Sequence, residues 1–196
     1  AVVLPRYEDI YPDDYHFRVT EDAFSRVMEG ARRPGHFDGV LTVVMKLLHL
    51  VEPDYAYFGK KDYQQYELIR RMCEAFLMPV RIIACATIRD FDGLACSSRN
   101  VKLSQADREK AARFPHLLRE GATSEDACER LERAGFEVEY VEEHLGRRFG
   151  AVRLGGVRLL DNISLKRIRR GKPGPGGKTV AAAGGGMTEN AGKEGG

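Results

Sequence analysis

Apolar positions in the first half of the chain recur with the spacing of helices and buried strands. Residues 37–51 place apolar side chains at i, i+3, i+4, i+7, i+8 and i+11, which predicts one helix with a single apolar face: Val40, Val43, Val44, Leu47, Leu48 and Val51. Residues 55–58 and 80–85 are apolar runs that predict two strands, and Asp62 can begin a helix between them. Two apolar strands joined through a helix predict a parallel sheet covered on both faces, as in α/β proteins.

One further helix is expected in this half. Thr20, followed by the acidic Glu21 and Asp22, predicts a short helix that runs through Met28 and ends at Gly30. The helix after Asp62 should turn five side chains inward: Leu68, Ile69, Met72, Cys73 and Phe76.

The second half changes to a different pattern. Ser104 with Asp107, and Thr123 with Asp126, have capping-box spacing and predict two helices before Gly135. Alternation from residue 136 to 142 predicts a half-buried strand, and strands at 149–154 and 157–160 flank a Gly-Gly hairpin turn. These elements predict a small α+β domain with an antiparallel sheet.

We therefore divide the chain into three parts. Residues 1–87 are expected to form an incomplete nucleotide-binding α/β domain, and residues 88–167 a small C-terminal α+β domain. Residues 168–196 are rich in glycine and have no periodic apolar pattern, which predicts a disordered tail.

Composition narrows the class of protein. The chain has 196 residues, 43% hydrophobic and 31% charged, with a net charge of +2, so its overall charge favours neither nucleic acid nor membrane as a partner. It contains no apolar stretch near 18 residues and no signal peptide pattern. The four cysteines (Cys73, Cys85, Cys96 and Cys128) show no C-x-x-C and no metal-ligand spacing, so we expect reduced thiols, a cytoplasmic location and no dedicated metal site.

Two polar clusters carry candidate chemistry. Gly59, Lys60, Lys61 and Asp62 follow the first strand, at the carboxyl end where α/β sheets bind ligands. Lysine places a mobile cation on phosphate oxygens, and aspartate accepts hydrogen bonds from ribose hydroxyls. The second cluster joins the hydroxyls of Ser97 and Ser98 to the Arg99 guanidinium, whose planar fork suits phosphate. Taken singly, the first cluster is also typical of a solvated turn and the second of a helix-capping loop.

The order of motifs along most of residues 10–165 resembles the pantothenate synthetase (pantoate–β-alanine ligase) family. The matching segments are Arg33-Pro34-Gly35-His36-Phe37-Asp38-Gly39-Val40, Thr42-Val43-Val44-Met45-Lys46-Leu47, Pro53-Asp54, Phe58-Gly59-Lys60-Lys61-Asp62-Tyr63-Gln64-Gln65, Thr87-Ile88-Arg89, Asp92-Gly93-Leu94-Ala95, Ser97-Ser98-Arg99-Asn100, Val152-Arg153-Leu154-Gly155-Gly156-Val157-Arg158-Leu159 and Asp161-Asn162. The resemblance implies a partial Rossmann-like domain of the nucleotidyltransferase superfamily with a parallel sheet.

The resemblance also implies an activity and a set of site residues. Family members use ATP, with Mg²⁺, to adenylate pantoate and release pyrophosphate, and the β-alanine amine then attacks the pantoyl-adenylate to give pantothenate and AMP. By resemblance, the catalytic residues are Lys61, Ser97, Ser98 and Arg99, and those contacting ATP are Gly59, Lys60, Lys61, Asp62, Ile88, Cys96, Ser97, Ser98 and Arg99. Gln65 and His36 are the expected substrate-binding residues, and a homodimer is the expected assembly.

Several alternatives stay open. Family members carry a His-x-Gly-His element in an N-terminal segment, and no two of the five histidines here form it, so we expect the chain to lack that segment. The second hypothesis is accordingly a non-catalytic nucleotide-binding remnant, and a third is nucleic-acid binding through the basic residues 166–172. His36 is also a candidate helix cap or packing group, and we expect Arg89 and Asp92 to form a structural pair.

Overall fold

The computed structural model describes residues 2–165, so the predicted glycine-rich tail and the basic run from residue 166 lie outside the described residues. The first half contains helix α1 (Tyr7–Ile10), α2 (Glu29–Arg32), α3 (His36–Val51) and α4 (Tyr63–Ala75), with strands β1 (Tyr55–Gly59) and β2 (Arg81–Cys85). The second half contains α5 (Gln105–Ala111), α6 (Phe114–Glu120), α7 (Ser124–Arg133), β3 (Glu137–His144), β4 (Arg147–Leu154) and β5 (Val157–Ser164). Short 3-10 helices lie at Phe24–Arg26, Lys60–Asp62 and Asn100–Lys102.

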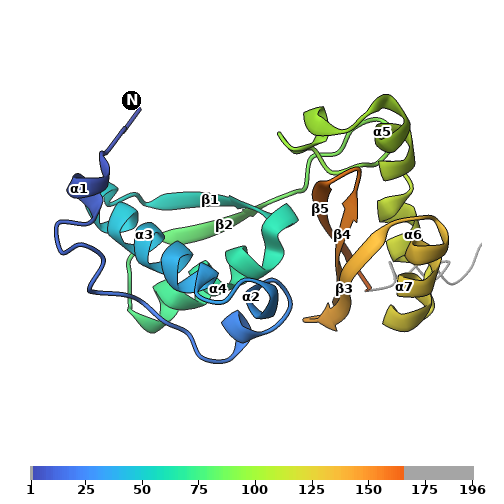
Figure 1. Ribbon diagram of the computed structural model, residues 1–196. Coiled ribbons are helices and arrows are strands. Elements are labelled where there is room, and N and C mark those ends of the chain that lie inside the picture. The colour runs from blue at the N-terminus through green and yellow to red at the C-terminus, as the bar shows by residue number, and fades with distance from the viewer. Residues whose placement is uncertain (1, 166–196) are drawn as a thin grey trace, which may run out of the picture. The chain divides into compact units, whose positions relative to one another are not determined.

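Strands β1 and β2 pair in parallel, as the two apolar runs predicted, with Tyr55 opposite Arg81 and Gly59 opposite Cys85. Helices α3 and α4 lie along this sheet and share a core of buried side chains (Figure 1). The members of that core are Phe37, Leu41, Leu48, Leu68, Ile69, Met72 and Cys73. The expected apolar face of α3 is shifted, since Phe37 and Leu41 are buried while Val51 is 52% exposed.

Three predictions for this half were wrong. The sheet was expected to be covered on both faces, but among the described residues Tyr55 and Tyr57 of β1 are 49% and 68% exposed, so one face is open. Phe76 does not turn inward with the other α4 residues, because α4 ends at Ala75 and Phe76 is 60% exposed. The helix expected from Thr20 to Gly30 is absent; the described chain has only a 3-10 turn there, followed by the single turn of α2. The Glu21 carboxylate accepts hydrogen bonds from the backbone N–H of Phe24 and Ser25, so these donors are satisfied without a continuous helix.

The second half forms an antiparallel sheet in the order β3-β4-β5, with α6 and α7 against it (Figure 1). The predicted hairpin is confirmed, because Gly155 and Gly156 have φ of 55° and 75° and join β4 to β5. The predicted caps are also present: the hydroxyls of Ser104 and Thr123 accept hydrogen bonds from the backbone N–H of Asp107 and Asp126.

Up to residue 165, this half holds three α-helices where two were expected. The chain breaks between α5 and α6 because Pro115 lies in the first turn of α6, where a proline is tolerated and a preceding helix cannot continue through it. The boundary expected between residues 87 and 88 lies after β2 and before the bridge of Arg89 with Ala95, and it stays a prediction.

The fold brings the carboxyl end of β1 against β5. Gly59 ends β1 and leads directly into the 3-10 turn Lys60–Asp62 and then α4. Asn162 of β5 donates hydrogen bonds to the carbonyls of this turn, so both halves of the chain contribute to the region. Within residues 2–165, no helix has both the length and the apolar character needed to cross a membrane.

Candidate functional site

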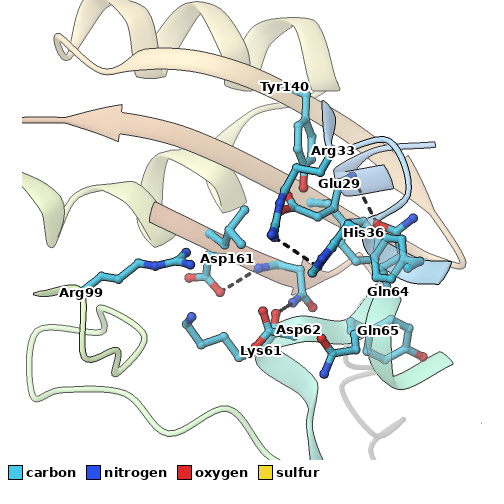
Figure 2. A pocket seen from close by; sticks show the side chains of 15 residues that line it. Glu29, Arg33, His36, Lys61, Asp62, Gln64, Gln65, Arg99, Tyr140 and Asp161 are labelled. Atoms are coloured by element: carbon cyan, nitrogen blue, oxygen red, sulfur yellow. Dashed lines mark hydrogen bonds and ion pairs between the residues drawn. The ribbon is translucent and has the colours of Figure 1, made fainter. Parts of the chain in front are cut away.

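A cavity of about 300 Å³ opens at the end of β1, between the Lys60–Asp62 turn and β5. Figure 2 shows the side chains of Lys61 and Arg99 approaching it from separate segments of the chain. Its lining combines charged, amide and aromatic side chains: Glu29, Arg33, His36, Phe37, Lys61, Asp62, Tyr63, Gln64, Gln65, Arg99, Tyr140, Phe149, Leu160, Asp161 and Asn162. A cavity with converging polar groups over an apolar base is typical of a small-molecule site.

The turn that carries Lys61 is held by a buried amide. The Asn162 Nδ2 donates to the Lys60 and Lys61 carbonyl oxygens at 2.9 and 2.8 Å, and Asn162 is 2% exposed. The Arg147 Nε in turn donates to the Asn162 Oδ1 at 2.6 Å, which fixes which way the amide points. The backbone under Lys61 is therefore fixed while its ammonium faces the cavity.

Arg99 reaches the same cavity from a loop between β2 and α5. The Ser97 hydroxyl accepts a hydrogen bond from the Arg99 backbone N–H at 3.2 Å, and the Asn100 amide donates to the Ala95 carbonyl at 3.1 Å. Ser97 lies in a small recess that Lys61 and Arg99 also line. A hydroxyl, an ammonium and a guanidinium thus surround one space, and all three can donate hydrogen bonds to phosphate oxygens.

The expected pair of Arg89 with Asp92, at the start of this loop, is not formed. Arg89 does not pair with Asp92: its guanidinium makes a two-pronged ion pair with Asp161 on β5, at 2.7 and 2.9 Å. Asp92 pairs instead with Arg108 of α5, at 2.5 Å, and this hydrogen bond holds the pKa of the Asp92 carboxyl below its ordinary value. The two carboxylates anchor the loop to different elements, which spacing along the sequence does not reveal.

His36 lies at the edge of the cavity in a neutral form. Burial, followed by the nearby Arg33 guanidinium, lowers its pKa. Arg33 Nη1 lies 3.1 Å from His36 Nε2, and because a guanidinium only donates, Nε2 accepts and the ring proton is on Nδ1. The lone pair that a general base would need is therefore engaged by Arg33 in this arrangement.

Arg33 belongs to an ion-pair chain that crosses the fold. It pairs with Glu29 of α2 at 3.2 Å, and Glu29 receives both terminal nitrogens of Arg158 on β5 at 2.8 Å. Burial alone raises the pKa of Glu29, but the hydrogen bonds from Arg158 and then Arg33 outweigh it and lower the pKa overall. Glu29 therefore stays ionised and fixes the two arginines beside the cavity.

The structure brings together part of the expected set. His36, Lys61, Asp62, Gln65 and Arg99 line the cavity, and Ser97 lines the adjoining recess. The other expected residues are not among those that line these two spaces: Gly59, Lys60, Ile88, Cys96 and Ser98. The side chain of Ile88 is 71% exposed, so an adenine-backing role for it stays a prediction.

Sequence reasoning missed the buried residues that support the site. Gln64 is 5% exposed; its Nε2 donates to the Phe24 and Val27 carbonyls, and its Oε1 accepts from the Glu29 backbone N–H. A signal was available, since Gln64 falls one helical turn before Leu68 on the buried face of α4. Asp161 and Asn162 were noted only through the family resemblance, although two polar residues inside an apolar strand indicate a structural or functional role.

Comparison with known proteins identifies the family to which this arrangement is similar. Residues 1–164 match the family model described as pantoate-beta-alanine ligase. The pantothenate synthetase of Legionella pneumophila (strain Lens) is 49% identical over 163 residues, covering 83% of this chain and 65% of the relative. That of Bdellovibrio bacteriovorus is 47% identical over 165 residues, covering 84% of this chain and 66% of the relative.

Solved structures agree. The pantoate-beta-alanine ligase of Francisella tularensis, crystallised with beta-gamma ATP and beta-alanine, has a TM-score of 0.74 and 38% identity, covering 81% of this chain and 62% of that one. The pantothenate synthetase of Thermus thermophilus has a TM-score of 0.73 and 37% identity, covering 82% of this chain and 68% of that one. The chain spans slightly less than two thirds of the length of the curated relatives it matches.

Proposed function

The chain belongs to the pantoate–β-alanine ligase family, and we propose that it acts in the ATP-dependent condensation of pantoate with β-alanine. In the first step a pantoate carboxylate oxygen attacks the α-phosphorus of ATP, the bond to the β-phosphate oxygen breaks, and pyrophosphate leaves. In the second step the β-alanine nitrogen attacks the activated carbonyl carbon, a proton is lost from the amine, and AMP leaves to give pantothenate.

One observation carries this proposal: Lys61, Arg99 and Gln65 line the same cavity although they come from separate places in the sequence. The first step brings an anionic carboxylate to an anionic triphosphate and leaves charge on pyrophosphate. Fixed donors and cations must therefore offset that charge, and removing one such donor typically costs about 3 kcal/mol of transition-state stabilisation. Lys61 and Arg99, joined by Ser97 in the adjoining recess, supply these groups.

Gln65 is proposed to bind pantoate. Its amide both donates and accepts hydrogen bonds, which suits a substrate that carries hydroxyls as well as a carboxylate. Gln64, its neighbour, is buried and fully engaged with backbone groups, so it supports α2 and leaves substrate binding to Gln65. Burial and Arg33 lower the pKa of His36, so its ring is neutral, and we propose that it lines the same pocket and forms a hydrogen bond with substrate.

Mg²⁺ is proposed to accompany ATP. Among residues 2–165 no three His, Cys, Asp or Glu side chains are grouped so as to hold a metal ion. Mg²⁺ beside a nucleotide is usually held mainly by phosphate oxygens and water, and it needs only one or two protein ligands. Asp62 is the carboxylate of the cavity for which the described residues show no ion pair, and it would be the protein ligand at hand. The ion would neutralise charge on the pyrophosphate group.

We also propose that the protein works as a homodimer in the cytoplasm. The end of α3 presents Leu50 and Val51, which are 59% and 52% exposed, beside a groove lined by Ile10 and Met45. Exposed apolar residues beside a groove are typical of an interaction surface. All four cysteines are free thiols, which suits a reducing compartment. Light scattering of the purified protein tests the assembly, and a single-chain mass would contradict it.

The activity is tested by measuring pyrophosphate release with ATP, pantoate and β-alanine. We expect pyrophosphate release to require pantoate. The formation of pantothenate and AMP should require β-alanine as well. Pyrophosphate release that is indifferent to pantoate, or no release with all three compounds present, would contradict the proposal.

A further inference from the structure

A second cavity, which we call the arginine groove, opens beside the candidate site. It has a volume of about 670 Å³ and is lined by Arg32, Arg33, Arg99, Glu137, Val138, Glu139, Arg153 and Arg158. Five guanidinium groups face two carboxylates, so the lining carries a surplus of positive charge. Val138 is its one apolar residue and no aromatic side chain lines it, so the groove has nothing on which a nucleotide base would stack.

Part of this positive charge is already neutralised. Arg158 pairs with Glu29 and Glu139, Arg153 pairs with Glu139 at 2.8 Å, and Arg33 pairs with Glu29. These ion pairs fix the arginines in place, and each guanidinium keeps further N–H groups for a ligand, because it carries five donors.

The positive charges of two arginines in the groove are not neutralised by ion pairs among the described residues. Within the described part of the chain, neither Arg32 nor Arg99 has a carboxylate within ion-pair distance, and both residues are exposed. Arg32 ends α2 and Arg99 lies in the loop before the Asn100–Lys102 turn, so residues distant in sequence meet at one groove. Guanidinium groups that converge without a carboxylate partner are typical of a site for phosphate oxygens.

The groove is joined to the candidate site through shared residues. Arg33 and Arg99 line both the groove and the main cavity, and Arg158 lines both the groove and the recess that contains Ser97. The groove therefore extends from Arg99, at the edge of the main cavity, to Arg32 and Arg153.

We propose that the arginine groove binds inorganic pyrophosphate, the leaving group of the first step, and provides its route out of the site. This inference rests on the proposed function for the identity of the anion. Pyrophosphate carries several charges on a small body, so it matches a site built from many forked donors and lacking a surface for a base. The main cavity, which has amide and aromatic groups, would bind ATP, pantoate and β-alanine.

The test uses a double variant, Arg32→Gln with Arg153→Gln. Both side chains are exposed and neither lines the main cavity, so the fold and the ATP contacts are retained. The matched control, Arg119→Gln with Arg133→Gln, removes the same charge from exposed positions at the ends of α6 and α7. Calorimetric titration with pyrophosphate should show affinity that is about five- to tenfold weaker in the groove variant, the loss of two charge-assisted contacts at an exposed site.

The same titrations include a non-hydrolysable ATP analogue, whose affinity should be equal in the two variants. Pyrophosphate affinity that is unchanged in the groove variant, or weakened equally in the control, would overturn the inference. The proposed function is judged separately: turnover together with unchanged pyrophosphate affinity rejects the groove alone, whereas selective loss of pyrophosphate affinity without turnover supports the anion site and rejects the ligase activity.

Discussion

At the scale of single residues, Lys61 depends on a contact that lies about one hundred positions away in the sequence. Asn162 donates to the carbonyls of Lys60 and Lys61, and Arg147 holds the Asn162 amide in the orientation that allows this. Side chains that touch no substrate can thus decide where a charged group points. The residue pattern around Gly59 indicates phosphate chemistry, but it does not indicate this support.

Lys61 and Arg99 should affect a different substrate from Gln65. We expect Lys61→Ala and Arg99→Ala each to weaken ATP binding by about 2 kcal/mol, the typical value of a hydrogen bond to a charged group. Gln65→Ala should instead raise the KM for pantoate. Lys102→Ala is the control, since Lys102 is an exposed lysine just beyond Arg99. Equal damage to both substrates from all three changes would contradict the assigned roles.

Asn162→Asp tests the support of the turn. The carboxylate keeps an acceptor for Arg147 but replaces a donor with an oxygen facing the Lys60 and Lys61 carbonyls. We expect the free energy of unfolding to fall by about 1 to 3 kcal/mol, the cost of leaving buried groups unsatisfied, and ATP affinity to fall with it. Thermal denaturation and ATP titration measure the two effects. A variant with unchanged stability and unchanged ATP affinity would show that the amide does not position the turn.

At the scale of elements, the sequence pattern correctly predicted the helices, strands, caps and turn that depend on residues close together in the chain. The parallel strands, the α3 and α4 helices, the caps at Ser104 and Thr123 and the Gly155-Gly156 hairpin follow from periodicity, side-chain capping and positive φ. The failed helix from Thr20 shows the limit: Gln64 takes two carbonyls of that segment, so a long-range contact replaces the helical pattern. The partners of Arg89 and Asp92 were also misassigned, because Asp161 lies 72 positions from Arg89 and Arg108 lies 16 positions from Asp92, beyond what local spacing indicates.

The packing of α6 on β4 depends on the absence of a side chain at Gly150. A Cβ there would lie 2.9 Å from Leu118 Cδ1 and 3.2 Å from Phe114 Cε2, closer than packed carbon atoms approach. Overpacking a core typically costs about 1 to 3 kcal/mol, so Gly150→Val should lower the unfolding free energy by that amount or more. Chemical denaturation measures it. Gly59→Val is the control, since Gly59 has a φ of -71° and a Cβ there meets nothing within 4 Å; equal losses in the two variants would contradict the crowding argument.

At the scale of the whole described molecule, one ion pair joins the two halves of the chain. Glu29 of α2 and Arg158 of β5 lie 129 positions apart and meet through two hydrogen bonds of 2.8 Å. Truncating one partner of a buried pair is costly because the other charge is then left unpaired. The pair stands beside the cavity, so stability and the geometry of the site depend on the same contact.

The pair predicts a pH dependence. Hydrogen bonds from Arg158 and Arg33 lower the pKa of Glu29 in the folded state against the opposing effect of burial. A lowered folded-state pKa means that its stabilisation is complete above the unfolded pKa, about 4.3, and is lost as pH falls through the folded value. We expect the Tm to drop on acidification below about pH 4.3, and to drop less steeply in Glu29→Gln, which has no proton to gain. Parallel Tm profiles for the two proteins would contradict this.

The central claim is that Lys61 and Arg99 act on one triphosphate from separate segments of the chain. A crystal structure with a non-hydrolysable ATP analogue and Mg²⁺ tests it most directly. We predict phosphate oxygens about 3 Å from both the Lys61 Nζ and the Arg99 guanidinium, within hydrogen-bond distance. An analogue bound elsewhere, or a triphosphate that contacts one of these groups while the other stays turned to solvent, would contradict the account.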